Sequence, residues 1–503
     1  MSISSAASRH HESNDDRTYS SLQEVMTALA AAENKTFREL DHTGRAESAG
    51  NKGSLGHIIE ESVLGYALNS DAEPDIRIGE DQYELKVTPL KHVKNGKETS
   101  AKERLVIDVI NYMKLAQEDE FESSVMWDKA RNIILVYYYD DRADRKRELR
   151  IDCRVLASFL LQYRESDLAT IKEDWETIRD KVASGHADEL SESDTNYLAA
   201  CTKGANARQM REAPAPADAG SPTIQAKQRA FSFKASYMTA VAQQLLSQSR
   251  DLQRLPMDAD QTLNEYVRDR FSRFIGEPAG DIADELNVRV SPAANQYNAS
   301  IVRAMLGVGN GGLTDTEEFR KANVSMAKTV TVYPDGLPKE HMSFRALTAE
   351  QWAQWADSKK TWEDSFLSDF FETNRFLITV FHSPSAYQKG HDKSKDVFQG
   401  GFLWNMPAED VKQYVEPVWE KVHKLLVRRT WLDYGVRGKN KLPGASFNGV
   451  FHLRSHASKG RGSGRAQDIT RLPSGEEITK QAFWLDRHYI AAIAGKHGLL
   501  PQK

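Results

Sequence analysis

Two stretches of this sequence, about half a chain apart, repeat the same order of local patterns. The first, TNYLAACTKGANAR, is followed by KQRAFSFKASYMTAVA, and the second, VFHLRSHASKGRG, is followed by TKQAFWLDRHYIAAIA. In each, a strand ending in a basic loop precedes a Lys-Gln step, an aromatic strand and a helix that carries a tyrosine. Solenoid repeats span about 20–50 residues, so this longer period indicates duplication of a whole domain.

Chain length agrees with two domains, because 503 residues exceed what one hydrophobic core usually supports. We expect a disordered polar tail over residues 1–20. A first domain is predicted over residues 21–252, and a second, related domain over residues 258–503. The two would be joined in tandem.

Local patterns predict a mixed α/β fold. Apolar residues at helical spacing predict helices over residues 21–40, 57–68 and 155–185. The segments DIRIGE and QYELKVTPL alternate apolar and polar residues and predict a hairpin, while LVIDVINYMKL and NIILVYYYDD add strand or buried segments. The segment REAPAPADAGSPTI predicts a flexible loop or linker.

Charge and cysteine content narrow the class of protein. The formal net charge of -5 argues against indiscriminate coating of nucleic acid, although basic runs at residues 86–104 and 454–471 could meet phosphates or form ordinary solvated loops. Cys153 and Cys201 are too few for a disulfide framework or a zinc cluster. With no long apolar run, we expect a soluble cytoplasmic protein.

One hairpin carries residues suited to phosphodiester hydrolysis. In EPDIRIGEDQYELKV, Asp75 precedes one strand, and Glu84 and Lys86 lie on the same face of the next. Carboxylates at this place would bind a divalent cation, while Lys86 would orient or help deprotonate the attacking water. This is the PD-(D/E)xK pattern, which by itself also recurs by chance in exposed strands.

A glutamate on the preceding helix strengthens the pattern. Glu60 lies on a helix that is otherwise apolar at Ile58, Ile59 and Val63, and a carboxylate there needs a partner or a metal. Alternatively, Glu60 and Glu61 both lie on a solvated helix face.

Taken in order, the segments KGSLGHIIEESVLGY, PD, ELKVTPL and AKERLVIDVINY resemble the MutH superfamily, especially its two-domain type II restriction endonucleases that cut at GATC. The resemblance implies a Mg2+-dependent site made of Glu60, Asp75, Glu84 and Lys86. A further catalytic lysine of the family matches Lys129, with Arg131 as the alternative alignment.

The resemblance extends to residues that would contact DNA. It places Lys203 at the bases, on a loop whose Lys or Arg can bind guanine; a phosphate contact or a plain surface lysine is the alternative. The same comparison adds the following candidate DNA contacts: Arg208, Lys234, Arg454, His456 and Lys480.

The second domain resembles an altered counterpart of the first. In LTDTEEFRKANVSMAKTVTVYP, Met326 stands where a metal-binding carboxylate would precede Lys328, and a thioether is a poor ligand for Mg2+. The resemblance therefore implies a pseudo-nuclease domain that does not cut, binds a second DNA site and activates the first domain.

The function expected from this resemblance is a type II restriction endonuclease. It would cleave double-stranded DNA at GATC, before the G, and would dimerise on DNA because a palindrome needs two active sites. A MutH-like mismatch-repair strand nickase would use the same residues. A non-catalytic GATC-binding regulator is the alternative from a different class.

Overall fold

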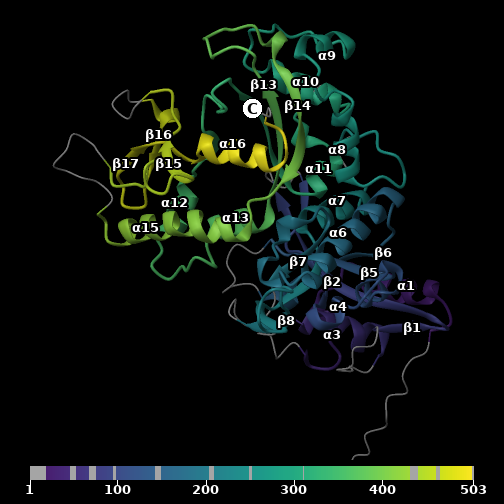
Figure 1. Cartoon of the computed structure of the whole chain (residues 1–503). Coiled ribbons are helices and arrows are strands. Elements are labelled where there is room, and N and C mark those ends of the chain that lie inside the picture. Colours follow the sequence, from purple (N-terminus) through teal and green to yellow (C-terminus); the bar gives the residue numbers. More distant parts are fainter. Residues whose placement is uncertain are drawn as a thin grey trace, which may run out of the picture. The chain divides into compact units, whose positions relative to one another are not determined.

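The structure is a computed structural model that describes residues 19–45, 53–66, 75–93, 98–141, 149–202, 209–247, 252–309, 311–430, 440–459 and 465–500 (Figure 1). Contacts within the chain define two units. The first joins Met1–Asp108, Asp119–Tyr163 and Met238–Arg250, and the second joins Val109–Glu118, Arg164–Tyr237 and Asp251–Lys503. The boundary between these units does not coincide with the domain boundary predicted at residues 252–258. The predicted boundary, which concerns the two related halves of the sequence, stays a prediction.

A mixed sheet is the centre of the first unit. Strand β2 pairs antiparallel with β1 and β3 and parallel with β5, and β5 pairs antiparallel with β6. The elements of this unit are α1 (Leu22–Ala30), α2 (Phe37–Leu40), α3 (Ser54–Ile58), the π-helix η2 (Ile59–Leu64), β1 (Ile76–Ile78), β2 (Asp81–Val93), β3 (Glu98–Ala101), η3 (Phe121–Ser123), α5 (Val125–Ala130), β5 (Ile133–Tyr139), η4 (Arg150–Asp152) and β6 (Val155–Leu160). Two further elements, β4 (Leu105–Val109) and α7 (Ala235–Leu245), contain residues of both units.

The predicted hairpin is confirmed. Ile78 of β1 pairs with Asp81 of β2, so Gly79 and Glu80 form a two-residue turn. Gly79 has φ 62°, which lies in the left-handed region that two-residue hairpin turns require and that glycine adopts without strain.

Among the described residues, the second unit contains two three-stranded sheets, two two-stranded hairpins and one further antiparallel strand pair. Its first part consists of α4 (Tyr112–Leu115), α6 (Glu165–Ala183), η5 (Ala187–Glu189), η6 (Glu192–Asp194), β7 (Leu198–Thr202), β8 (Met210–Pro214), β9 (Thr223–Lys227) and β10 (Arg229–Phe233). From residue 252 on it consists of α8 (Leu263–Ser272), α9 (Ala279–Glu285), α10 (Tyr297–Met305), η7 (Leu313–Asp315), α11 (Glu317–Lys321), β11 (Val324–Val332), β12 (Met342–Ala346), α12 (Ala349–Trp355), α13 (Phe366–Thr373), β13 (Arg375–His382), η8 (Lys393–Lys395), β14 (Val397–Trp404), α14 (Ala408–Asp410), η9 (Val411–Val415), α15 (Glu416–Val427), β15 (Phe451–Ser455), η11 (Ala466–Asp468), β16 (Ile469–Arg471), β17 (Glu477–Thr479), β18 (Gln481–Leu485) and α16 (Arg487–Lys496). Helices α12 and α15 lie beside each other (Figure 1).

Sheet topology repeats between the two halves of the chain. In the first half β2 is parallel to β5, and β5 is antiparallel to β6. In the second half β11 is parallel to β13, and β13 is antiparallel to β14. The same order of strand directions supports the duplication that the sequence indicates.

The short antiparallel pairs repeat as well. Arg229 of β10 pairs with Thr202 of β7, and Gln481 of β18 pairs with Ser455 of β15. A helix follows the second strand in each case, α7 after β10 and α16 after β18. By this register, His456 follows β15 as residue 203 follows β7.

Two sequence predictions are wrong in detail. Residues 155–185 do not form one helix, because Val155–Leu160 is strand β6, which completes the sheet beside β5. A short apolar run fits a strand as well as a buried helix segment, so periodicity alone does not separate them. The predicted linker at residues 211–224 contributes to the hairpin of β8 and β9, in which Pro214 pairs with Thr223 at the end.

Each unit has its own apolar core. The first gathers residues from the helices before β1 and from β2, β5 and β6, with Val25, Phe37, Ile58 and Ile134 fully buried. The second is rich in aromatic side chains, including Trp352 and Trp355. None of the described helices is long and apolar enough to cross a membrane.

Candidate active site

The β1–β2 hairpin positions the three residues of the predicted motif. Asp75 precedes β1, and its Oδ2 accepts a hydrogen bond of 2.7 Å from the Leu85 N–H of β2. The Lys86 ammonium donates to Oε1 of Glu84, so both side chains lie on one face of β2. The Glu84 N–H donates to the carbonyl of Asn132 at 2.9 Å, which ties this part of β2 to the start of β5.

Glu60 and Glu61 have different surroundings. This difference bears on the two alternatives for this helix, Glu60 directed to the motif or both glutamates on a solvated face. Glu61 forms a two-pronged ion pair with Arg45, with both N–O distances 2.9 Å, and the pKa of Glu61 is lowered chiefly by that hydrogen bond. Burial, followed by the negative charge of Asp75, raises the pKa of Glu60 to about 7, and Lys86 opposes this rise. Glu60 therefore faces the motif, while Glu61 is occupied by Arg45.

Lys129 belongs to the same neighbourhood. Burial and the charge of Glu84 raise the pKa of Asp75, while Lys86 and Lys129 act in the opposite direction. The Lys129 ammonium donates to Oδ1 of Asp108 on β4 at 2.8 Å. Asp108 was not singled out from the sequence, and its one signal is a charged residue inside the apolar strand LVIDV.

Arg131 has a different partner. Its guanidinium lies 3.6 Å from Asp128, its neighbour on the same short helix, and both side chains are well exposed. Of the two aligned candidates, Lys129 is thus the one whose charge acts on Asp75.

The donor set fits a hard divalent cation in its chemistry. Glu60, Asp75 and Glu84 offer carboxylate oxygens, the ligands that Mg2+ and Ca2+ prefer, and the raised pKa values of Glu60 and Asp75 reflect partly buried negative charges near one another. In the described part of the chain no three acidic, histidine or cysteine side chains stand at metal-ligand spacing. Glu84 is instead paired with Lys86.

Of the three DNA contacts predicted for the first half, the structure describes only Lys234. Lys203 and Arg208 lie outside the described residues. Lys234 is 4% exposed and its ammonium donates to the carbonyl of Thr195; burial, with Arg375 nearby, lowers the pKa of Lys234. A direct DNA contact by Lys234 is therefore not compatible with this conformation.

Three predicted contacts of the second half surround the end of β15. Arg454 is exposed, with its guanidinium carbon 5.3 Å from the ring centre of Trp484. His456 is also exposed, and its backbone N–H donates to the carbonyl of Lys480 at 2.7 Å. These side chains are accessible to a ligand, with Lys480 half-buried.

In the second half the strand register places Met326 at the position of Glu84. Glu84 pairs with Ile133 at the start of one parallel ladder, and Met326 pairs with Phe376 directly after the register shift that follows the first pair of the other. The ladders also end alike. The Asp140 N–H donates to the Leu90 carbonyl, and the Ser383 N–H donates to the Val332 carbonyl. Leu90 and Val332 lie equally far along their strands from Glu84 and Met326. By this register Lys328 corresponds to Lys86. The short helix α11, not a β-hairpin, precedes β11.

Known proteins are similar to the part of the chain that carries most of this candidate site. The family model described as "DNA mismatch repair enzyme MutH" matches residues 64–174, which include Asp75, Glu84, Lys86 and Lys129. The DNA mismatch repair protein MutH of Shewanella woodyi is 30% identical over 167 residues, covering 33% of this chain and 66% of that protein. These two matches relate this part of the mixed α/β fold to the MutH proteins.

A second relative covers nearly the whole chain. The type II restriction enzyme Sau3AI of Staphylococcus aureus is 30% identical over 503 aligned residues, which cover 94% of this chain and 98% of that enzyme. The chain therefore belongs to this family of type II restriction enzymes. The expectation of a site-specific deoxyribonuclease is confirmed.

Proposed function

We propose that the first half of the chain hydrolyses double-stranded DNA at GATC, on the 5′ side of the G, in a Mg2+-dependent reaction. The observation that carries the proposal is the gathering of Glu60, Asp75, Glu84 and Lys86 around the β1–β2 hairpin. The target sequence follows from the resemblance to GATC-cutting enzymes.

Each group has a chemical role in this proposal. Mg2+ held by Asp75, Glu84 and Glu60 would supply a more acidic water and neutralise charge on the phosphate. The Lys86 ammonium orients the attacking water and stabilises negative charge that develops on the phosphate oxygens. Glu84 holds that ammonium in place, because the two side chains are paired on one face of β2.

Sequence specificity is tested with two short duplexes. One carries a single GATC site and the other carries GTAC, which has the same composition and is also a palindrome. We expect cleavage of both strands of the first duplex in Mg2+ and no cleavage of the second. Cleavage of one strand would indicate a nickase, and binding without any cleavage would indicate a regulator; either result would contradict the proposal.

Lys129 is proposed as the additional catalytic lysine. We expect Lys129→Met to slow cleavage by roughly 10–100-fold, since its charge acts on Asp75 and its ammonium is held by Asp108. Arg131→Met is the matched control, because Arg131 pairs with exposed Asp128. Single-turnover rates on the GATC duplex measure both, and equal rates for the two variants would remove Lys129 from the site.

The second half is proposed to bind DNA without cutting it, and to activate the first half. Met326 replaces the strand glutamate there, and a thioether is a poor ligand for Mg2+. A plasmid with two GATC sites should therefore be cut several-fold faster per site than a plasmid with one. Equal rates per site would exclude activation, while leaving the nuclease itself untouched.

Cleavage of a palindrome on both strands needs two active sites, and this proposal gives each chain one. We therefore propose that two chains meet on the DNA as a homodimer. Sedimentation of the protein in EDTA, with and without a GATC duplex, should show two chains per complex when DNA is present. A complex of one chain that still cuts both strands at once would contradict this arrangement.

A further inference from the structure

A pocket of about 450 Å³ lies where the second half has lost its motif glutamate. Strand β11, strand β12 and the end of β15 contribute to its wall. The side chains relevant here are Ser325, Met326, Lys328, Ser343, Arg345 and His456. The pocket thus lies at the counterpart of the first half's candidate active site.

Basic groups line this pocket without acidic ones. Lys328, Arg345 and His456 are part of the wall, and no Asp or Glu is among the lining residues. Within the described ranges no carboxylate forms an ion pair with Lys328 or Arg345. Burial lowers the pKa of Lys328 with no opposing carboxylate, whereas Lys86 in the first half is paired with Glu84. The second pocket has therefore exchanged a cation-binding set of side chains for an anion-binding set.

A β-bulge adds a hydroxyl donor to the wall. The ladder of β11 with β13 shifts register between Val324 and Met326, so Ser325 is the extra residue of the strand. Its Oγ is buried and has no hydrogen-bond partner among the described residues. A buried hydroxyl without a partner costs free energy, and bulges beside active sites re-aim side chains toward them. Ser325 therefore contributes an unsatisfied hydroxyl to the wall of this pocket.

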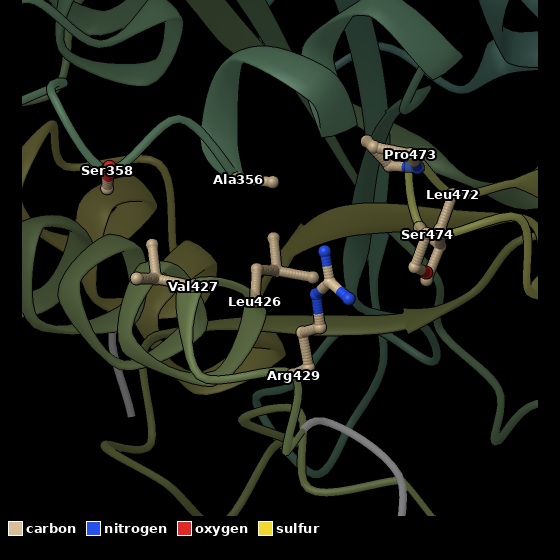
Figure 2. Close-up of a pocket in the computed structure, with 8 residues that line it drawn as sticks. All are labelled: Ala356, Ser358, Leu426, Val427, Arg429, Leu472, Pro473 and Ser474. Carbon is tan, nitrogen blue, oxygen red and sulfur yellow. The ribbon is translucent and has the colours of Figure 1, made fainter.

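The cavity in Figure 2 offers a contrast. It has a volume of about 280 Å³ and is lined mainly by apolar side chains such as Leu426 and Leu472, with Arg429 as its one charged lining residue. Nothing there combines several cationic groups with an unsatisfied donor. The β11 pocket is the stronger candidate for an anion.

We propose that the β11 pocket binds a backbone phosphodiester of duplex DNA without a divalent metal ion. The inference rests on the proposed function, since it takes DNA as the ligand. The replacement of Glu84 by Met326 at this ladder position removes the negative charge that would repel a phosphate in the absence of metal. Lys328 and Arg345 then supply the positive charge that the metal ion and Lys86 would share in the first half, and His456 adds a ring nitrogen that can donate a hydrogen bond.

The first test measures binding of a labelled GATC duplex to the full chain in EDTA, by fluorescence anisotropy across a range of salt concentrations. We expect Lys328→Ala to weaken binding about tenfold and to reduce the slope of log affinity against log salt by about 1, the effect of one lost phosphate contact. Lys389→Ala, an exposed lysine outside the pocket lining, is the matched control and should leave both values unchanged.

A second pair of variants keeps the test valid if Lys328→Ala disturbs the fold. Met326→Glu restores the carboxylate and should weaken binding in EDTA more than tenfold, because the new charge pairs with Lys328 and repels phosphate. Met326→Gln has a similar size without the charge and should bind within about twofold of the original chain. Unchanged affinity in both Lys328→Ala and Met326→Glu would overturn the proposal.

Two further measurements separate the possible failures. Titration with inorganic phosphate at fixed ionic strength identifies a simple anion site; if Lys328→Ala loses phosphate binding and keeps its duplex affinity, the DNA assignment is wrong. Plasmid cleavage by the unaltered chain tests the proposed function separately. If the unaltered chain cuts DNA but Lys328→Ala and Met326→Glu bind the duplex normally, the proposed role of the β11 pocket is wrong and the proposed nuclease function stands. If the unaltered chain never cuts DNA but these variants lose duplex affinity in EDTA, the proposed nuclease function is wrong and the proposed role of the pocket stands.

Discussion

Glu84→Gln is expected to slow DNA cleavage by roughly 10³-fold, equivalent to several kcal/mol of transition-state stabilisation. Glutamine keeps the size of the side chain but removes the negative charge that pairs with Lys86 and that would bind a divalent cation. Because the β2–β5 ladder is formed by backbone groups, the fold should be retained. Single-turnover cleavage of the GATC duplex measures the loss, and circular dichroism checks the fold.

Glu80→Gln is the matched control for this substitution. Glu80 lies in the turn of the same hairpin and is exposed, so its replacement should leave the cleavage rate within about twofold. A Glu84→Gln enzyme that cuts as fast as Glu80→Gln would exclude Glu84 from the chemistry.

Asp174→Ala is expected to destabilise the second unit by roughly 3–5 kcal/mol. Asp174, on α6, is 1% exposed. Its carboxylate accepts hydrogen bonds from the N–H groups of Asn196, Tyr197 and Leu198, at 2.7, 2.6 and 2.9 Å. Alanine leaves these buried donors without partners at the start of β7. Urea unfolding followed by tryptophan fluorescence measures the change.

Asp180→Ala is the control on the same helix. Asp180 is 67% exposed at its side chain and pairs with its neighbour Arg179, so its loss should change stability by less than about 0.5 kcal/mol. Because β7 runs directly into the segment that contains Lys203, Asp174→Ala should also weaken recognition of GATC. Equal stability of the two variants would contradict the structural role of Asp174.

Local patterns predicted the core of the candidate site well. The spacing of Glu84 and Lys86 places both on one face of a strand by geometry alone, and the structure pairs them there. The Gly79–Glu80 turn between two alternating segments is also a local signal, so the hairpin followed from the sequence. Both features depend on residues that are neighbours in the chain.

Features that depend on distant partners were not predictable in this way. Helical periodicity did not decide whether Glu60 or Glu61 faces the motif, because the answer depends on Arg45 pairing with Glu61. Lys234 was expected at DNA, but its burial results from packing around β7 and β10. Residues 155–160 were expected to be helical. They form strand β6 because they pair with β5, a partner that the local pattern does not reveal.

Duplication of the fold explains how one chain holds two different sites. The backbone ladder of β2 and β5 recurs in β11 and β13 from Met326 onward, after a register shift between Val324 and Met326 that the first ladder lacks. Backbone hydrogen bonds maintain the sheet in both halves, while the side chains at the same ladder position differ, Glu84 in the first and Met326 in the second.

The most direct test of the central claim is to digest an unmethylated plasmid with the purified chain in Mg2+ or in EDTA and to sequence all fragment ends. The account predicts cleavage in Mg2+ alone, with every 5′ end beginning with GATC. An intact plasmid in Mg2+, or ends that begin at other sequences, would contradict it.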